Sequence, residues 1–224
     1  MRAVIFGATG MVGQGALQEC LRDGDVDRVV SIVRAPSGKQ HDKLHEIVHK
    51  DFLNFTAIEK ELTGLDACLY CLGVTSTGIT EEAYARITYE FTIAAAKTLL
   101  RLNPEMAFVF VSGSGTDSTE RGNVMWARAK GKAENAVLAL PFRAVCVFRP
   151  AMIQPLDGIE SKTASYRILY RLASPLLSGA RRFWPQYIST TQELGRALLA
   201  AAKRGTGKRV VEARQIREVL QELS

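Results

Sequence analysis

Apolar residues follow two alternating patterns along this chain. Short runs that are apolar throughout, several of them rich in Val and Ile, are typical of strands buried on both faces. Between them lie longer stretches in which apolar residues recur every three or four positions, as on the buried face of a helix. The alternation predicts a parallel sheet whose strands are connected by helices. The expected strands are 1–6, 27–33, 46–50, 65–72, 106–111, 143–148 and 209–212.

The helical stretches also carry end signals. Thr80 can cap a long helix whose first turn contains Glu81 and Glu82, where negative charge interacts favourably with the helix dipole. Gly205 follows another helix at its C-terminal end. With helices on both faces, these elements predict an α/β fold built on a doubly wound parallel sheet. The expected helices are 15–21, 56–62, 81–102, 123–138, 190–203 and one that starts near residue 213.

The first strand leads directly into the glycine-rich turn Gly7-Ala8-Thr9-Gly10-Met11-Val12-Gly13. Gly7 permits a tight exit from the strand, Gly10 lets the backbone approach a pyrophosphate, and Gly13 lets the following helix pack closely. The helix N-terminus offers unpaired N–H groups to phosphate. Strand, glycine turn and helix in this order predict a dinucleotide site in a Rossmann-type fold. The alternative is a tight turn that binds no ligand.

The end of the second strand selects the cofactor in such folds. An acidic residue there binds the ribose 2′-hydroxyl, whereas an arginine accommodates a 2′-phosphate. The strand ends at Arg34, with Lys39 shortly after it and no acidic residue between them. Because a guanidinium suits phosphate geometry, the sequence favours NADP(H) over NAD(H). The alternative is a solvated surface arginine.

Two further strand ends offer cofactor contacts. Asp51 and Phe52 follow the third strand, at the carboxyl edge where ligands of open α/β sheets bind. Asp51 can accept a hydrogen bond from the adenine amino group, and it can also cap the short helix that follows. Gly73 follows the fourth strand, where small residues leave room for a cofactor to cross the strand end.

Composition limits the class of protein. The 224 residues contain 29 Lys and Arg against 23 Asp and Glu, which gives a formal net charge of +6. This modest excess suits a phosphorylated cofactor and lacks the concentrated basic face that nucleic-acid binding requires. No apolar run approaches the ~20 residues of a membrane span, and the glycine turn interrupts the first apolar run, so no signal peptide is expected. The sequence therefore predicts a cytoplasmic protein with one domain over 1–224, without a membrane or nucleic-acid partner.

Neither the cysteines nor the histidines are expected to bind a metal. Cys68 and Cys71 form a C-x-x-C pair, but they lie in an apolar run that predicts a strand, and no second pair completes a zinc set. The four cysteines fit a reducing compartment. His41, His45 and His49 would share one face of a helix, but the predicted strand 46–50 makes a continuous helix there improbable.

The stretch 161–183 is both apolar and basic. A basic amphipathic helix can lie on a membrane or on a partner protein. The commoner explanation is a helix that covers the substrate cleft, with its arginines in solvent or facing an anionic substrate. We therefore expect 154–188 to form a small C-terminal region over the cleft.

Hydroxyl groups follow the fifth strand. Ser112 and Ser114 lie at its carboxyl end, where a hydroxyl is a candidate hydrogen-bonding group for a substrate, although a Ser/Gly-rich loop is equally common as a plain turn. The helix after this loop contains Lys130. The sixth strand continues into Arg149-Pro150-Ala151-Met152-Ile153.

With these motifs the chain resembles the atypical short-chain dehydrogenases/reductases, in particular small NAD(P)-binding proteins similar to epimerases and dehydratases. The resemblance covers about 1–153, and the glycine turn is its most specific part. It implies a nicotinamide near the Arg-Pro segment, a small-molecule substrate, and a monomer or a homodimer formed through the long helices. The cofactor contacts we expect are Gly7, Thr9, Gly10, Met11, Val12, Gly13, Arg34, Asp51, Phe52, Gly73, Lys130, Pro150 and Ile153.

One position departs from that family's pattern. There, a tyrosine four residues before the lysine is the general acid/base, and the lysine binds the nicotinamide ribose and lowers the pKa of the tyrosine. Here the pair is Trp126 and Lys130. An indole N–H donates a hydrogen bond but does not transfer a proton near neutral pH. The departure leaves cofactor binding intact and removes the usual proton-transfer group.

Two functions are compatible with these residues. The first is an NADP(H)-dependent oxidoreductase acting on a small carbonyl or related substrate, with Ser112 or Ser114 binding the substrate, Lys130 binding the ribose and Trp126 shaping the pocket. The second is a non-catalytic module that binds NADP(H) as a structural or redox-sensing ligand and acts through a protein partner. The retained lysine and serines favour the first function, and Trp126 favours the second.

Overall fold

The computed structural model describes residues 1–156, 158–159 and 186–222. The strands of the main sheet are β1 (Arg2–Phe6), β2 (Arg28–Val33), β3 (Leu44–Val48), β4 (Ala67–Tyr70), β5 (Ala107–Val111), β6 (Ala144–Arg149) and β9 (Val210–Glu212). They are all parallel and lie in the order β3-β2-β1-β4-β5-β6-β9. The chain builds from β1 outward to β3, then returns past β1 and builds to the other edge. This is the doubly wound, Rossmann-type topology that the sequence predicts.

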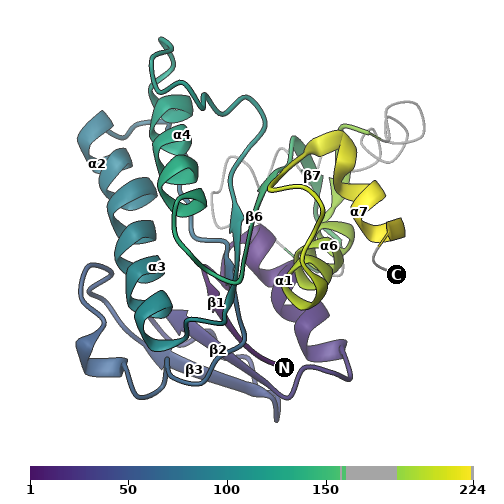
Figure 1. Cartoon of the computed structure of the whole chain (residues 1–224). Helices are drawn as coiled ribbons and strands as arrows, with labels where there is room; N and C mark the ends of the chain where they lie inside the picture. Colours follow the sequence, from purple (N-terminus) through teal and green to yellow (C-terminus); the bar gives the residue numbers. More distant parts are fainter. Residues whose placement is uncertain (157, 160–185, 223–224) are drawn as a thin grey trace.

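Helices cover both faces of this sheet (Figure 1). They are α1 (Met11–Arg22), α2 (Glu81–Ala85), η2 (Arg86–Glu90), α3 (Phe91–Leu102), α4 (Met125–Leu138), α6 (Thr191–Arg204) and α7 (Ile216–Glu222). Helices α1, α6 and α7 share one apolar core with strand residues such as Ile5 and Val109. Helices α3 and α4 share the other core with Phe6, Tyr70 and Phe108. Strand side chains alternate between the two cores because successive residues of a strand point to opposite faces.

Four shorter elements complete the described chain. Two one-turn 3₁₀ helices, η1 (Thr56–Ile58) and η3 (Ala213–Gln215), follow strands β3 and β9. A separate two-stranded parallel sheet joins β7 (Met152–Gln154) to β8 (Ile188–Thr190). These two strands bracket the expected cleft-covering segment 154–188. Most of that segment, and all of the basic stretch 161–183, lies outside the described residues.

Some element boundaries differ from those expected. Strand β3 begins at Leu44 rather than at residue 46, because it is an edge strand whose outer face is solvated and whose apolar pattern is therefore weak. The helix expected over 81–102 is interrupted by η2, a π-helical turn. There the Thr92 hydroxyl donates a hydrogen bond to the backbone oxygen of Thr88, a local alternative to the regular helix pattern. The helix expected over 56–62 is only the single turn η1.

Helices α1 and α6 touch through their backbones. A methyl group placed on Gly15 would lie 2.4 Å from the backbone oxygen of Thr191, and one on Gly195 would lie 2.7 Å from the backbone oxygen of Gly15. Two glycines therefore let α6 lie directly against α1, a contact that joins the C-terminal part of the chain to the glycine-turn helix. The sequence pattern predicts both helices but not this pairing. A Thr190 capping box with Glu193 fixes where α6 begins.

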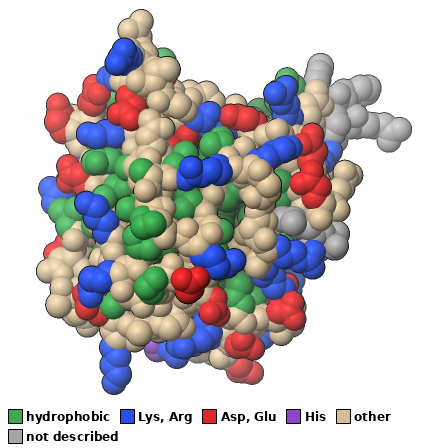
Figure 2. Space-filling view, viewed as in Figure 1, with side chains coloured by type: hydrophobic (Ala, Val, Ile, Leu, Met, Phe, Trp, Pro, Cys, Tyr) green, Lys and Arg blue, Asp and Glu red, His purple; other side chains and the backbone are tan. Residues whose placement is uncertain are grey.

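In the described part of the chain, no helix is both long and apolar enough to cross a bilayer. On the face seen in Figure 2, Lys and Arg side chains are interspersed with Asp and Glu rather than gathered into one basic area.

Candidate functional site

The site expected from the sequence lies at the carboxyl edge of the sheet, between the neighbouring strands β1 and β4. The strands that follow β1 in the chain are added on one side of it, and those that follow β4 are added on the other side. This is the switch point at which ligands of doubly wound sheets bind. Gly7 ends β1 with φ +78°, and a methyl group placed on it would lie 2.7 Å from the backbone oxygen of Cys71. Backbone from both halves meets here too closely for a side chain, so this position requires glycine.

The first turn of α1 is open to an anion. Gly10 is its N-cap and carries no side chain that accepts a hydrogen bond from the helix. A methyl group placed on Gly13 would lie 2.1 Å from the backbone oxygen of Gly7, so α1 rests directly on the turn. Met11 and Val12 anchor the same turn by packing against the core that α1 shares with α6. The backbone of Thr9 is held by the Gln14 amide, which donates to its oxygen at 3.3 Å. This rigid cradle of backbone N–H groups fits the pyrophosphate of a dinucleotide.

Arg34 and Asp51 lie at the same carboxyl edge of the sheet as this cradle, beyond strands β2 and β3. Arg34 is exposed, one residue beyond β2 and at the same edge of the sheet as Gly7. Asp51 is also exposed, beyond β3, and its carboxylate accepts a hydrogen bond from the Leu53 backbone at 3.0 Å. The helical turn η1 follows Asn54, whose side chain accepts from the Thr56 backbone at 2.9 Å. Asp51 therefore stabilises its own turn, and η1, whose N-cap is Phe55, has no side-chain cap of the kind expected from Asp51.

Three of the expected cofactor residues contribute mainly to packing. The Phe52 side chain is buried between the rings of Phe6, Phe55 and Phe91. Ile153 is buried in the core under α1. Pro150 is buried, and its backbone oxygen accepts from the Ser114 backbone at 2.9 Å. Gly73 is exposed beyond β4 with open space around its Cα.

The Ser112 hydroxyl is buried and belongs to a short hydrogen-bonded chain. Its Oγ lies 3.0 Å from Oγ1 of Thr116, and Thr116 donates to the backbone oxygen of Gly113 at 2.7 Å. A threonine hydroxyl has one proton, and a carbonyl oxygen only accepts, so Ser112 is the donor to Thr116. Ser112 therefore keeps only acceptor capacity for another group. Ser114 is exposed, two residues further along the loop.

Helix α4 presents Trp126 and Lys130 to this loop from the same face. A methyl group placed on Gly113 would lie 3.9 Å from Cε of Lys130, and one on Gly115 would lie 3.4 Å from ring carbon Cη2 of Trp126. The i, i+4 spacing that the sequence predicts thus brings both side chains against the strand end of Ser112. Trp126 contacts the loop, and it stands at the position where the family that the chain resembles has its tyrosine.

Close backbone packing fixes α4 against the loop. A methyl group placed on Gly131 would lie 1.8 Å from the backbone oxygen of Asp117. The Asp117 carboxylate accepts from the Gly122 backbone at 2.7 Å and from the Thr119 hydroxyl at 2.6 Å. These hydrogen bonds hold the pKa of Asp117 below its usual value. The loop is therefore built to hold its shape beside Lys130 and Trp126.

The electrostatics of Lys130 set it apart from the other lysines. It is partly buried, and loss of hydration lowers its pKa to about 8, against an opposing effect of the Glu134 carboxylate one turn away. Glu134 is fully buried and is bound by Arg149, whose Nε lies 3.0 and 3.1 Å from its two oxygens. Arg149 also pairs with Glu212 at 2.9 Å. The Glu134 carboxylate, one turn from Lys130, is thus ion-paired with another cation.

Sequence reasoning missed this supporting network. Arg149 was expected only as part of a segment near the nicotinamide, and the structure shows it joining α4, β6 and β9 through Glu134 and Glu212. Thr116 was not singled out at all. Two features of the sequence hinted at this network: Glu134 lies four residues after Lys130, and Arg149 lies at the end of a buried strand. The sequence does not show which of these charged side chains form ion pairs, because the pairing depends on tertiary packing.

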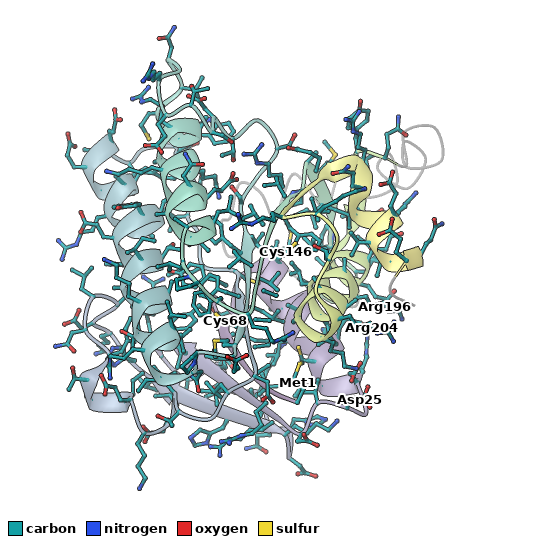
Figure 3. All side chains as sticks on the ribbon, viewed as in Figure 1. Met1, Asp25, Cys68, Cys146, Arg196 and Arg204 are labelled. Atoms are coloured by element: carbon teal, nitrogen blue, oxygen red, sulfur yellow. The ribbon has the colours of Figure 1, made fainter. Side chains whose placement is uncertain are left out.

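Cys68 lies in β4, whereas Cys71 lies one residue beyond that strand and is half-buried. Cys68 and Cys146 are buried on different strands (Figure 3), and all four cysteines are free. Burial raises the pKa of the Cys146 thiol to about 11, so it stays protonated. His45 lies in β3 and His49 just beyond it, so the histidines share no helix face. Among the residues described, no group of three potential ligands could hold a metal ion.

A hollow of about 330 Å³ lies away from this edge, at the C-terminal end of α1. Its lining includes Arg196 and Arg204, which Figure 3 shows on α6. Arg196 pairs with Glu19 at 3.0 Å, and Lys203 binds Asp23 at 2.7 Å. These ion pairs join α1 to α6.

Known proteins share the sequence pattern of this chain. The sequence profile of a family described as NAD(P)H-binding matches residues 7–144. A curated relative from Meyerozyma guilliermondii, named Protein FMP52, mitochondrial, is 24% identical over 203 residues, which are 90% of this chain and 85% of that protein. One from Emericella nidulans, named Protein fmp52, mitochondrial, is 29% identical over 156 residues, 66% of this chain and 65% of that protein.

Solved structures share the fold. A UDP-glucuronic acid 4-epimerase from Bacillus cereus, solved in complex with NAD, superposes with a TM-score of 0.66 at 14% identity and covers 95% of this chain and 76% of its own. Gre2 from Candida albicans, solved with NADPH, superposes with a TM-score of 0.69 at 12% identity, covering 95% and 77%. Epimerases and reductases that bind nicotinamide cofactors therefore have this architecture.

The relatives contradict the expected cytoplasmic location. Those from Meyerozyma guilliermondii, Scheffersomyces stipitis, Debaryomyces hansenii and Emericella nidulans are all named as mitochondrial proteins. The prediction was wrong because it rested on free cysteines and the lack of a long apolar run, and neither feature distinguishes the cytoplasm from the interior of an organelle.

Proposed function

This chain belongs to the NAD(P)H-binding family, and we propose that it is an NADP(H)-dependent oxidoreductase that acts on a small carbonyl compound or a related substrate. The observation that carries the proposal is the convergence of an open glycine cradle at α1 with a partly buried lysine and a buried serine at the end of β5. The lysine can also serve a site that only holds the cofactor, whereas the buried serine hydroxyl beside the loop is placed for a substrate.

Each residue has a role in this proposal. The first turn of α1 binds the pyrophosphate, and the exposed Arg34 binds the ribose 2′-phosphate through charge-assisted hydrogen bonds. Lys130 holds the nicotinamide ribose. Ser112 contacts the substrate oxygen, and Trp126 forms a wall of the pocket against Gly115. The bound nicotinamide supplies hydride chemistry, and the protein supplies orientation and exclusion of water.

The cofactor preference is tested by Arg34→Ala. Removing a charged hydrogen-bonding partner of the 2′-phosphate should weaken NADPH binding about 10- to 100-fold and leave NADH binding unchanged. Titration of protein fluorescence with each cofactor measures both constants. Arg28→Ala is the matched control, since Arg28 starts the same strand at the opposite edge of the sheet. Tighter binding of NADH by the wild type, or an unchanged NADPH constant in Arg34→Ala, would remove this role from Arg34.

A second candidate function is a module that binds NADP(H) without catalysis and signals through a protein partner, and Trp126 is the observation that favours it. Trp126→Tyr separates the two. If the remaining site is competent, a phenol facing the Ser112 loop should raise carbonyl reduction about 10-fold or more, because it adds a general acid. The readout is NADPH oxidation over a broad panel of small aldehydes and ketones.

Trp126→Phe is the matched control for that experiment. It opens the same space beside Gly115 but adds no hydroxyl, so a gain shared by both variants reports pocket size rather than proton transfer. If Trp126→Tyr binds NADPH normally and neither it nor the wild type reduces any carbonyl, the non-catalytic function is the better account.

A further inference from the structure

The proton chemistry of the site cannot come from its obvious hydroxyl groups. The position of the family tyrosine holds Trp126, whose indole does not exchange a proton near neutral pH. The buried Ser112 hydroxyl already donates to Thr116, which in turn donates to the backbone oxygen of Gly113. Ser112 can accept a hydrogen bond from a substrate hydroxyl or an ammonium group, but its own proton is committed. The side chain of the exposed Ser114 is an ordinary aliphatic alcohol, which is a very weak acid.

Lys130 lies in the right position to take over this role. Its Cε and Cδ lie 3.9 and 4.0 Å from a methyl group placed on Gly113, the residue that follows Ser112 after the carboxyl end of β5. Trp126 lies one helical turn away against Gly115 and covers the same loop. Glu134 is the carboxylate that would neutralise Lys130. In the described contacts it is instead bound by Nε and Nη2 of Arg149. The amine is therefore available to a ligand.

The charges around Lys130 favour easy release of its proton. On the helix of Lys130, the Glu134 carboxylate opposes deprotonation of the lysine. Arg149 of β6 forms an ion pair with Glu134 and a second one with Glu212 of β9. On the loop, the Asp117 carboxylate is turned onto backbone N–H groups and the Thr119 hydroxyl. Loss of hydration outweighs the effect of Glu134, which brings the pKa of Lys130 to about 8. Both protonation states are therefore populated near physiological pH.

We propose that Lys130 is itself the general acid/base of this site, exchanging a proton with the substrate oxygen in place of the missing tyrosine. The inference rests on the proposed oxidoreductase function and names the residue that completes it. Ser112 accepts a hydrogen bond from the Lys130 ammonium or from the hydroxyl of an alcohol substrate, and Thr116 is a positioning residue that keeps Ser112 an acceptor.

Reduction adds one hydride and one proton to the carbonyl group. The carbonyl carbon gains a hydride, one proton with two electrons, from the reduced cofactor, and the carbon–oxygen π bond opens onto oxygen. That oxygen forms its O–H bond with the proton released by the Lys130 ammonium. Lys130 is left as a neutral amine and regains a proton from water. Oxidation of the alcohol runs the same transfers in reverse.

The first test measures the titration of Lys130 without any substrate. Trace acetylation of the full chain with acetic anhydride over a pH series, read by peptide mass spectrometry, reports when each amine becomes reactive. Lys130 should reach half of its maximal reactivity near pH 8. Lys132, an exposed lysine on the same helix that lies over the Tyr89 ring, is the reference for the reactivity of an accessible amine. A Lys130 that becomes reactive only well above pH 8 overturns the proposal.

The second test separates the charge of Lys130 from its proton. Lys130→Arg keeps a cation for the cofactor but cannot release a proton near neutral pH. NADPH affinity should change by less than about threefold, and the turnover number for carbonyl reduction should fall about 100-fold. Lys132→Arg, outside the site, is the matched control and should leave both values unchanged.

The pH dependence has a defined sign. Reduction requires the ammonium form, so the turnover number of the wild type should fall as pH rises through about 8, whereas alcohol oxidation should rise over the same range. Both the fall of the reduction rate and the rise of the oxidation rate with pH should be absent in Lys130→Arg. A wild type that reduces carbonyls without this ionisation, or an arginine variant that keeps the normal rate, overturns the role of Lys130 alone. A wild type that binds NADPH and reduces nothing overturns the oxidoreductase proposal, and the role of Lys130 with it.

Discussion

Gly13→Ala should abolish NADPH binding and lower the free energy of unfolding by about 3 kcal/mol. The added methyl group would lie 2.1 Å from the backbone oxygen of Gly7 and 2.8 Å from Cα of Ala8. Both obstacles are backbone atoms of the turn that ends β1, so no side-chain rotation relieves the clash. Helix α1 must move away from the turn, and its N–H groups then no longer converge on the pyrophosphate. An alanine inside a helix normally stabilises it by about 0.5–1 kcal/mol relative to glycine, so the expected effect has the opposite sign to helix propensity.

The measurement is a pair of titrations, NADPH against protein fluorescence and urea against circular dichroism. Gly24→Ala is the matched control, because Gly24 lies just beyond the other end of α1 with open space around its Cα. It should retain cofactor affinity and stability. Wild-type NADPH affinity in Gly13→Ala would show that the cradle is not where the cofactor binds.

The part of this site that depends on local order could be predicted from the sequence. A strand, a glycine turn and a helix are consecutive in the chain, so the positions of Gly7, Gly10 and Gly13 follow from their order alone. The same holds for the pairing of Trp126 with Lys130, since four residues make about one turn of helix. Parallel strands end at one edge of the sheet, which is why Arg34 and Ser112 reach the same side of the molecule from distant segments.

Contacts between distant elements could not be predicted in this way. Glycines at 15 and 195 let α1 and α6 touch, but each is an unremarkable helix residue until the two helices are placed together. Phe52 was expected to contact the cofactor because of where it falls in the chain, yet its ring is buried between three others. The position of a residue at a strand end was predictable, but the direction of its side chain was not.

Hydrogen-bond direction is a further property that the sequence does not contain. A serine at the end of β5 is expected to donate to a substrate, and only the distances to Thr116 and onward to Gly113 reveal that its proton is already used. The consequence is functional, because the proton must then come from elsewhere in the site. The burial of Lys130 and the diversion of Glu134 to Arg149 supply the alternative.

Glu134→Gln should affect both stability and the pH dependence of the reaction. Glu134 has 1% of its side chain exposed and Arg149 has 13%, so their ion pair is nearly dry. Removing the charge leaves Arg149 with Glu212 alone as its carboxylate partner, a loss that should cost about 3 kcal/mol of unfolding free energy. Glu81→Gln is the matched control, because the pair between Glu81 and Arg128 is largely solvated and should contribute at most about 1 kcal/mol.

The same substitution moves the ionisation of Lys130 in a direction that the geometry fixes. The Glu134 carboxylate favours the charged form of Lys130, so without it the pKa of Lys130 falls further below about 8. Carbonyl reduction needs the ammonium form and should therefore decline from a lower pH than in the wild type, whereas alcohol oxidation should become faster at neutral pH. The pH dependence of Lys130 acetylation in Glu134→Gln should show the same fall in the pKa of Lys130 without any substrate. A variant that loses stability while Lys130 titrates unchanged would assign Glu134 to the Arg149 network alone and remove it from the tuning of the proton-transfer group.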